Sequence, residues 1–366
     1  MNYTLDCIEF WKENEKCVKP FSTDKPRVPL GFWLDDHFLL EEMAVPSTLK
    51  YYNDVEYRLE VNRQCNMRTE KAIAKKFYNE DPREEGKPMP NRFEVLVGAR
   101  WELTEGGTPW LESSVEGIED VKKLIDHAVR LDMKTAVLPD DWREKKAVYE
   151  KETGRALRLG GGGSRGPATM ATSILGTTNT CMFIMDEPEV MKEFFEMLAA
   201  KLVEYHSALM DLTGNDSRNG YSLADDNCYL FPPAQYEKFC APVLERLFKE
   251  FAPERQHARH QHSDSSMGHL MGILNDLGVN EVNFGPDIHP LEIRKAMPGA
   301  LIHGQIPPFV LRNGSPEDII NYVRRDIEAV GQDGGLLECP AGSVAAGTPL
   351  ENLKIYMWAV DKYGRY

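Results

Sequence analysis

The sequence predicts an α/β fold, an (αβ)8 barrel of the TIM type with an N-terminal helical and irregular extension. From about residue 93 onward, strand-like and helix-like stretches alternate along the chain, in roughly seven or eight pairs. Parallel strands need such helical crossovers, and closing the sheet into a barrel leaves no open edge. Polar residues stand where each late strand should end, and in this fold the strand ends share the face on which chemistry is done.

We expect two regions, an N-terminal extension over residues 1–90 that packs on the barrel and the barrel itself over residues 91–366. The extension is rich in charged residues, aromatic residues and proline. Its expected elements are helices at Asp6–Lys16 and Lys50–Lys75, a strand at Pro29–Leu34 and a loop at Asn79–Pro90. Prolines and a glycine exclude regular structure from that loop.

Within the barrel, hydrophobic periodicity predicts the first elements. The expected strands are Phe93–Leu103, Lys134–Leu138 and Gly220–Leu223, and the expected helices are Ile118–Leu131, Asp141–Gly154, Glu189–Thr213 and Pro233–Phe251. The glycine-rich run Gly160–Pro167 lacks the Gly-Lys-Ser/Thr ending of a phosphate-binding loop. It therefore predicts a mobile loop over the mouth of the barrel.

The charge and the cysteine content restrict the classes of partner and the compartment. A net charge of −15 argues against nucleic acid and anionic membrane surfaces as partners, because both would repel the chain. The first residues lack the apolar core of a signal peptide, and no run is long enough to span a membrane. Seven scattered cysteines do not form a disulfide pattern, so we expect a cytoplasmic protein. A homodimer is compatible with these features.

The expected strand ends of the last hundred or so residues carry ligand-type and acid/base side chains. They are Arg259–Asp264, Asn283–Gly285, His303–Gln305 and Glu338–Pro340. Residues two apart on a strand point to one side, so His260, His262 and Asp264 share a face, with His260 packed below the other two. Glu338 and Cys339 point to opposite sides of a regular strand, so at most one of them faces the mouth.

These side chains predict a metal site. A catalytic zinc needs three protein ligands and one open position, and His262, Asp264, Glu338 and Cys339 are the candidate ligands. Histidine and cysteine donors favour zinc over magnesium. Such an ion can polarise an ether or hydroxyl oxygen.

Several further motifs recur together in one known family. They are Gly166-Pro167, Asp186-Glu187-Pro188-Glu189, Asp225-Asp226, Ile302–Pro308, Ser315–Asp318, Gly334–Leu337 and Gly347–Leu353 with its Thr-Pro-Leu-Glu-Asn helix start. Together they resemble the uroporphyrinogen decarboxylase superfamily from about Phe93 to the C-terminus. The resemblance implies the barrel fold and two alternative chemistries, porphyrinogen decarboxylation and cobamide-dependent methyl transfer.

The resemblance is closer to the methyltransferases. True uroporphyrinogen decarboxylases carry an Arg-Gln-Ala-Gly-Arg-Tyr motif, of which only Arg63-Gln64 is present here. The thiol-methylating members bind zinc through a His-x-Cys pair and a late cysteine. Here His262 matches the first ligand, Asp264 replaces the cysteine, and Gly342 occupies the late position, three residues after Cys339. Relatives that demethylate aromatic ethers bind zinc through carboxylates and histidine, and this chain resembles those more.

The resemblance also implies roles for other strand-end residues. Those expected to be catalytic are Asp225, Asp226 and Gln305, and those expected to bind substrate are Asn283, His303 and Arg165. For the two aspartates, capping of the following helix is an alternative role.

The sequence therefore predicts a zinc-assisted methyltransferase. It would move a methyl group to a corrinoid protein from a small methoxylated substrate, and aromatic methoxy compounds are among the candidates. The chain has no Asp-x-His-x-x-Gly corrinoid motif, so we expect the corrinoid on a separate partner. The alternatives are a metal-independent decarboxylase and a non-catalytic barrel that binds a tetrapyrrole or corrinoid.

Overall fold

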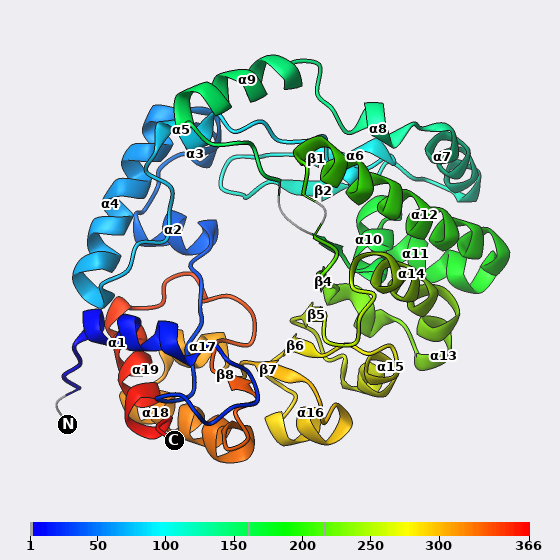
Figure 1. Cartoon of the computed structure of the whole chain (residues 1–366). Coiled ribbons are helices and arrows are strands. Elements are labelled where there is room, and N and C mark those ends of the chain that lie inside the picture. The colour runs from blue at the N-terminus through cyan, green and yellow to red at the C-terminus, as the bar shows by residue number, and fades with distance from the viewer. Residues whose placement is uncertain (1–2, 160–161, 216) are drawn as a thin grey trace. The chain divides into compact units, whose positions relative to one another are not determined.

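The computed structural model describes residues 3–159, 162–215 and 217–366 (Figure 1). Contacts within it divide the chain into two compact units. Unit 1 comprises described residues of 1–80, 105–108 and 280–366, and unit 2 comprises those of 81–104 and 109–279. Each unit includes residues from both sides of residue 90, and the division into an extension and a barrel stays a prediction.

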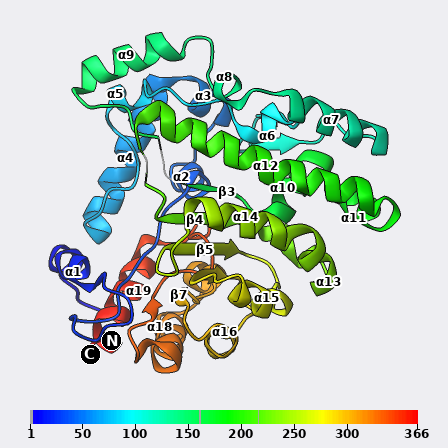
Figure 2. The ribbon, with the colours of Figure 1, turned by 45° about the vertical axis from the view of Figure 1, so that its right-hand side comes forward.

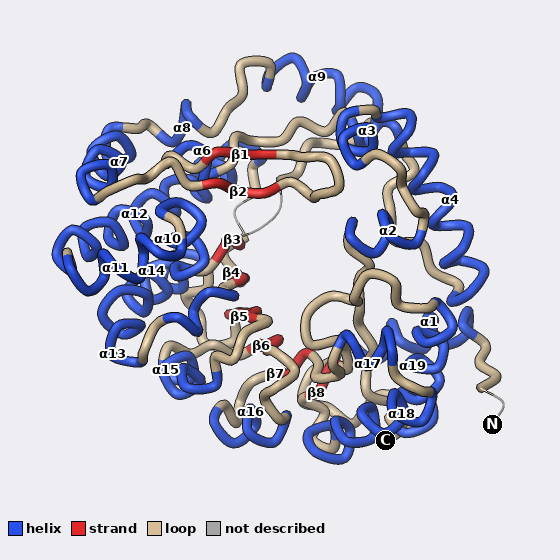
Figure 3. The backbone as a smooth tube through the Cα atoms, turned by 180° about the vertical axis from the view of Figure 1, so that it is seen from behind, coloured by secondary structure: helices blue, strands red, loops and turns tan. Residues whose placement is uncertain are grey.

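Unit 2 contains three parallel strands, an antiparallel hairpin and the helices between them. Its strands are β1 (Arg100–Glu102), β2 (Trp110–Glu112), β3 (Gly163–Arg165), β4 (Gly220–Ala224) and β5 (Ala258–Ser263). Its helices are α5 (Pro82–Glu85), α6 (Phe93–Leu96), α7 (Ile118–Arg130), α8 (Met133–Ala136), α9 (Trp142–Thr153), α10 (Pro167–Leu175), α11 (Thr177–Asp186), α12 (Pro188–Thr213), α13 (Pro233–Gln235), α14 (Ala241–Phe251) and α15 (Met271–Asp276), with short helical segments at Asp226–Leu230, Tyr236–Cys240 and Gly268–Leu270. Strands β3, β4 and β5 pair in parallel, and β1 pairs with β2 in antiparallel. Figure 3 shows β1 beside β2, and β3, β4 and β5 next to one another.

The core of unit 2 lies between its parallel strands and its long helices. Helix α12 packs against α7 and α14, and α14 packs against β4 (Figure 2). Tyr221 of β4 stacks on Phe251 of α14, with ring centroids 5.4 Å apart. Both rings are buried, so this contact fixes the helix layer to the strands that carry the site.

Unit 1 joins the N-terminal residues to the last βα repeats of the chain. Its strands are β6 (Glu281–Phe284), β7 (Leu301–His303) and β8 (Leu336–Leu337). Its helices are α1 (Cys7–Asn14), α2 (Asp36–Glu42), α3 (Thr48–Asn53), α4 (Val55–Ile73), α16 (Pro290–Ala296), α17 (Pro308–Asn313), α18 (Pro316–Asp326) and α19 (Leu350–Tyr363), with short helical segments at Glu15–Cys17 and Ile327–Gly331. Strand β7 pairs in parallel with both β6 and β8.

The predicted strand Pro29–Leu34 is reduced to a bridge at Leu30 that pairs in parallel with Glu338. The Glu338 N–H donates to the carbonyl of Pro29, and Gly31 N–H donates to the carbonyl of Glu338, each over 2.9 Å. The N-terminal segment is thus part of the strand pairing of unit 1.

Two other predicted strands are wrong. Within Phe93–Leu103, the first residues form helix α6 and only Arg100–Glu102 is extended, while Lys134–Leu138 lies largely in helix α8. Buried apolar residues four positions apart explain both helices, because that spacing places Phe93 with Val97 and Met133 with Val137 on one helical face. The predicted long helices of the barrel are confirmed to within a few residues, although Pro233–Phe251 is interrupted by a π-helical segment before Pro242. The predicted helix Lys50–Lys75 is divided at Asp54 into α3 and α4. The predicted loop Asn79–Pro90 contains the short helix α5, because a proline is tolerated in the first turn of a helix.

The predicted mobile loop Gly160–Pro167 is also wrong where the structure describes it, and Gly160 and Gly161 lie outside the described residues. Residues 163–165 form β3, and Pro167 begins α10. A Cβ on Gly162 would lie 2.6 Å from the ring of Tyr221, and one on Gly163 would lie 3.2 Å from the carbonyl of Ser222. These glycines therefore permit close approach of β3 to β4.

Across the described ranges, no helix has both the length and the apolar character that crossing a membrane requires.

Candidate metal centre and the adjoining cavity

The ends of three parallel strands place the candidate residues of unit 2. The pairing register sets Arg165 of β3 opposite Ala224 of β4, and Ala224 opposite His262 of β5. Asp225 and Asp226 follow β4 directly, and Asp264 follows β5. Parallel strands end at one edge of a sheet, so these residues meet there.

Asp226, His262 and Asp264 form a group that can hold one metal ion, with one potential ligand atom from each lying within 4.8 Å of the others. The His262 Nε2 atom lies 3.3 Å from Asp264 Oδ1 and 3.6 Å from Asp226 Oδ1. The Asp264 N–H donates to Asp226 Oδ1 over 2.9 Å, which links the two strand ends. The sequence predicts His262 and Asp264 as ligands, and the structure adds Asp226, a residue predicted to be catalytic.

The environment of this group favours a bound cation. Burial raises the pKa of the Asp264 carboxyl above its ordinary value; the nearby His262 opposes that rise and the negative Asp226 adds to it. Solvent screens these effects, because 54% of the Asp264 side chain is exposed. Two carboxylates and an imidazole at this spacing attract a divalent ion, which would relieve their mutual repulsion.

Asp225 occupies a different environment, although it is adjacent to Asp226. Its side chain is fully buried, and its Oδ1 accepts a 2.7 Å hydrogen bond from the backbone N–H of Thr169 in the first turn of α10. Burial raises the pKa of Asp225 to about 7. Full burial keeps this carboxyl away from solvent and from any ligand in the cavity, so its observed contacts are those of an anchor between β4 and α10.

The pH dependence of folding tests this assignment for Asp225. The folded protein retains the Asp225 proton up to a pKa of about 7, against an ordinary value of 3.8, so burial of this group lowers stability progressively between pH 4 and 7. Between pH 5 and pH 8 we expect the free energy of unfolding of the wild type to fall by about 3 kcal/mol more than that of Asp225→Asn. Asparagine keeps the Oδ1 acceptor for Thr169 and does not titrate. Urea unfolding at pH 5 and pH 8 measures the difference; equal pH dependence in the two proteins would contradict the assignment.

A cavity of about 460 Å³ adjoins the group at Asp226. Its lining comes from β2, the end of β3, α10, the start of α11 and the turn after β4. The lining residues are Trp110, Leu111, Glu112, Ser113, Arg165, Thr169, Thr172, Ser173, Gly176, Thr177, Asp226 and Asn227. Arg165, predicted to bind substrate, is therefore in the same cavity as a candidate metal ligand. The other lining residues were not anticipated, since nothing in the sequence signals that β2 and α10 approach the end of β4.

Glu338 and Cys339, the other two predicted metal ligands, belong to unit 1 and are buried. The Tyr356 hydroxyl donates to Glu338 Oε1 over 3.1 Å, and burial holds the pKa of Glu338 well above its ordinary value. Burial likewise raises the pKa of the Cys339 thiol, whereas a cysteine binds metal as the thiolate. Neither residue belongs to the metal-holding group found among the described residues.

The remaining predicted site residues, Asn283, His303 and Gln305, also belong to unit 1, where they hold strand ends together. Asn283 Nδ2 donates to the carbonyls of His303 (2.5 Å) and Pro340 (3.0 Å), and Asn283 Oδ1 accepts from the N–H of Gly342 over 3.1 Å. Burial lowers the pKa of His303 to about 4, so its ring is neutral at pH 7.

Gln305 has a comparable bonding pattern. Its Nε2 donates to the carbonyls of Gly285 and Ile288, each over 2.9 Å, and its backbone N–H donates to Asp326 Oδ2 over 3.0 Å. These bonds tie the segment after β7 to the loop after β6 and to Asp326, so they give Gln305 a structural role.

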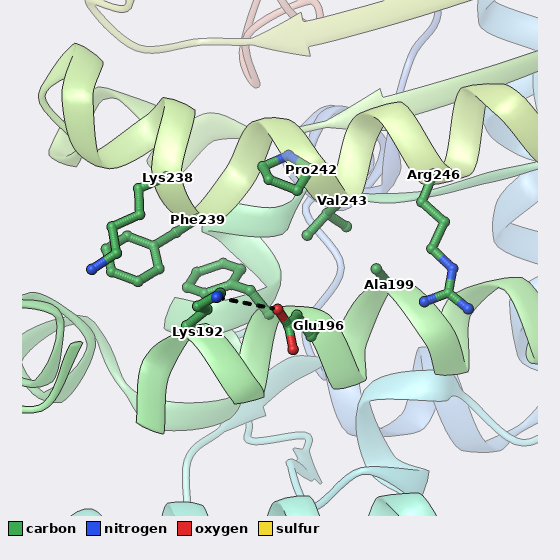
Figure 4. Close-up of a pocket in the computed structure, with 9 residues that line it drawn as sticks. Lys192, Glu196, Ala199, Lys238, Phe239, Pro242, Val243 and Arg246 are labelled. Carbon is green, nitrogen blue, oxygen red and sulfur yellow. Dashed lines mark ion pairs between the residues drawn. The ribbon is translucent and has the colours of Figure 1, made fainter. Parts of the chain in front are cut away.

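A second hollow in unit 2 lies on the helical surface between α12 and α14 (Figure 4). It has a volume of about 230 Å³ and an apolar floor that includes Phe239 and Val243. Lys192, Lys238 and Arg246 surround it, and Lys192 lies 3.9 Å from Glu196. It shares no lining residue with the cavity at Asp226 and contains none of the metal-holding group, so it is not the candidate catalytic site.

Comparisons with known proteins identify the family and the fold of the chain. The model of the family "Uroporphyrinogen decarboxylase (URO-D)" matches residues 95–363. Among solved structures, a methyltransferase from Methanosarcina mazei is similar with a TM-score of 0.59, covering 92% of this chain and 94% of that chain at 15% identity. A comparison with curated protein sequences gives no match. The structural likeness and the parallel βα repeats confirm the predicted α/β fold of the TIM-barrel type.

Proposed function

Because this chain belongs to the uroporphyrinogen decarboxylase family, we propose that it is a metal-assisted methyltransferase of that family. Its substrate is a small methoxylated compound, and its methyl acceptor is the corrinoid of a separate protein. The observation that carries the proposal is the group of Asp226, His262 and Asp264 at the edge of a substrate-sized cavity. A metal-independent decarboxylase would not need three metal-ligand side chains beside its substrate cavity.

The donor set fits a catalytic zinc site. Three protein ligands with a fourth position open to a cavity are the usual arrangement, and zinc accepts imidazole nitrogen and carboxylate oxygen. We assign Asp226, His262 and Asp264 as the ligands. The preference for zinc now depends on His262 alone, since Cys339 has no part in the set. When bound, zinc supplies Lewis acidity that draws electron density from an ether oxygen, so that the methyl group is transferred more readily to a cobalt(I) nucleophile.

The residues of the chain then have distinct tasks. Asp226 contributes to both the ligand group and the cavity wall, so a substrate in the cavity lies next to the ligands. Asp225 fixes α10, which forms one wall, through its bond to Thr169. The hydroxyl of Thr169 accepts from the N–H of Asn227 over 3.0 Å and holds the turn that carries Asp226. These contacts orient the ligands before a substrate binds.

The proposed reaction needs a corrinoid as methyl acceptor, and the likeness to a structure named as a methyltransferase supports methyl transfer. A corrinoid on another protein must reach the open side of the cavity for direct methyl transfer. The chain itself contains no Asp-x-His-x-x-Gly motif.

Methyl transfer to free cob(I)alamin tests the proposal. Zinc-loaded protein, para-methoxybenzoate and cob(I)alamin under anaerobic conditions should give methylcobalamin and para-hydroxybenzoate, followed by absorbance and chromatography. Removal of zinc with a chelator should stop the reaction, and readdition should restore it. A metal-free protein that decarboxylates uroporphyrinogen at full rate would overturn the proposal.

A further inference from the structure

Arg165 is the one positively charged residue that lines the cavity at Asp226, as far as the described residues show. It ends β3, and one third of its side chain is exposed (33%). The other charged lining residues are Asp226, a candidate metal ligand, and Glu112, which is exposed on β2. The cavity thus has a cation on the β3 side and the ligand group beside the turn after β4.

The contacts of Arg165 leave part of its guanidinium available. Its Nε lies 3.5 Å from Glu94 Oε1, and its Nη1 donates to Ser173 Oγ over 3.3 Å. A guanidinium has five N–H donors, so three remain after these two contacts. The remaining donors are on the two terminal nitrogens, which is the edge that binds a carboxylate through two parallel hydrogen bonds.

Two neutral polar side chains of the cavity wall already donate hydrogen bonds within the protein. The Ser173 hydroxyl donates to the carbonyl of Thr169 over 2.7 Å, and Asn227 Nδ2 donates to Thr172 Oγ1 over 2.6 Å. Trp110, 62% exposed, adds an apolar face to the cavity. The cavity wall therefore offers a ligand both a cationic group, Arg165, and an apolar surface, Trp110.

We infer that the cavity selects substrates that carry a carboxylate, which Arg165 binds through its terminal nitrogens while the methoxy group lies toward Asp226. Glu94 is the counter-charge of this guanidinium on its Nε side. The inference depends on the proposed function only for the position of the methoxy group; carboxylate recognition by Arg165 stands separately.

The groove between α12 and α14 is the rival anion site in unit 2, because Lys192, Lys238 and Arg246 surround it (Figure 4). Two of these cations already have acidic neighbours, with Lys192 3.9 Å from Glu196 and Lys238 3.8 Å from Glu189. Arg246→Gln is therefore the matched control for Arg165→Gln, since both remove one arginine that lines a hollow of unit 2.

Calorimetric titration of the zinc-loaded protein with para-methoxybenzoate and with its neutral analogue para-methoxybenzamide tests the inference. We expect the wild type and Arg246→Gln to prefer the carboxylate, and Arg165→Gln to lose about 10- to 100-fold in carboxylate affinity with little change for the amide. Arg165→Lys should retain part of the preference, because lysine keeps the charge but not the paired geometry.

A second variant keeps the inference testable if Arg165→Gln does not fold. Glu94→Gln removes the counter-charge, so carboxylate binding should strengthen by a few fold if Arg165 is the anchor. Retention of the carboxylate preference in Arg165→Gln, its loss in Arg246→Gln, or weakened binding in Glu94→Gln would each overturn the inference. If the preference follows Arg165 but no methyl transfer occurs, the proposed function fails and the carboxylate site stands.

Discussion

Replacing His262 with alanine should reduce methyl transfer about a thousandfold, the equivalent of about 4 kcal/mol in the barrier. His262 supplies the one nitrogen donor of the group, and its Nε2 lies within 3.6 Å of an oxygen of each carboxylate. Without it, two carboxylates remain, which bind zinc weakly. The measurement is the rate of methylcobalamin formation, with metal content determined in parallel.

The control for His262→Ala is His127→Ala, which alters an exposed histidine of α7 in the same unit. We expect this variant to keep the wild-type rate and the wild-type zinc content. Unchanged methyl transfer in His262→Ala, at unchanged zinc content, would show that the ion binds elsewhere.

Replacing Gly166 with alanine should lower the free energy of unfolding by about 3 kcal/mol. A Cβ at this position would lie 2.2 Å from both Cβ and Cγ of Asp225, far inside contact distance. The backbone φ of Gly166 is −68°, which alanine adopts without strain, so the effect is steric. Urea denaturation measures it, and Gly272→Ala is the control, because a Cβ at Gly272 meets nothing within 4 Å.

A double variant separates this clash from other effects. Removing the Asp225 side chain in Gly166→Ala/Asp225→Gly should recover part of the lost stability, giving a favourable coupling energy between the two positions. Strictly additive effects, or a Gly166→Ala protein as stable as Gly272→Ala, would contradict the packing of Asp225 against α10.

Much of the fold could be predicted because it depends on local patterns. Apolar residues at helical spacing locate α12, and a short apolar run before Asp225 locates β4. The errors arose where short segments satisfy two patterns at once. Phe93 and Val97 read as parts of one extended run, but their burial on one face shows a helical turn.

The candidate site was only partly predictable, for a physical reason. His262 and Asp264 are two residues apart on one strand end, so the sequence contains their proximity. The contribution of Asp226 depends on the register between β4 and β5, which no local pattern specifies. Glu338 was predicted as a ligand because it follows an expected strand. The sequence does not show that Glu338 is buried and accepts a hydrogen bond from the Tyr356 hydroxyl.

The central claim is that one ion binds among Asp226, His262 and Asp264. Anomalous diffraction from crystals of the zinc-loaded protein, recorded on both sides of the zinc absorption edge, tests it most directly. We predict one strong peak, about 2.0–2.2 Å from His262 Nε2 and from one oxygen of each aspartate. A peak at Glu338 and Cys339, or no peak at His262, would contradict the account.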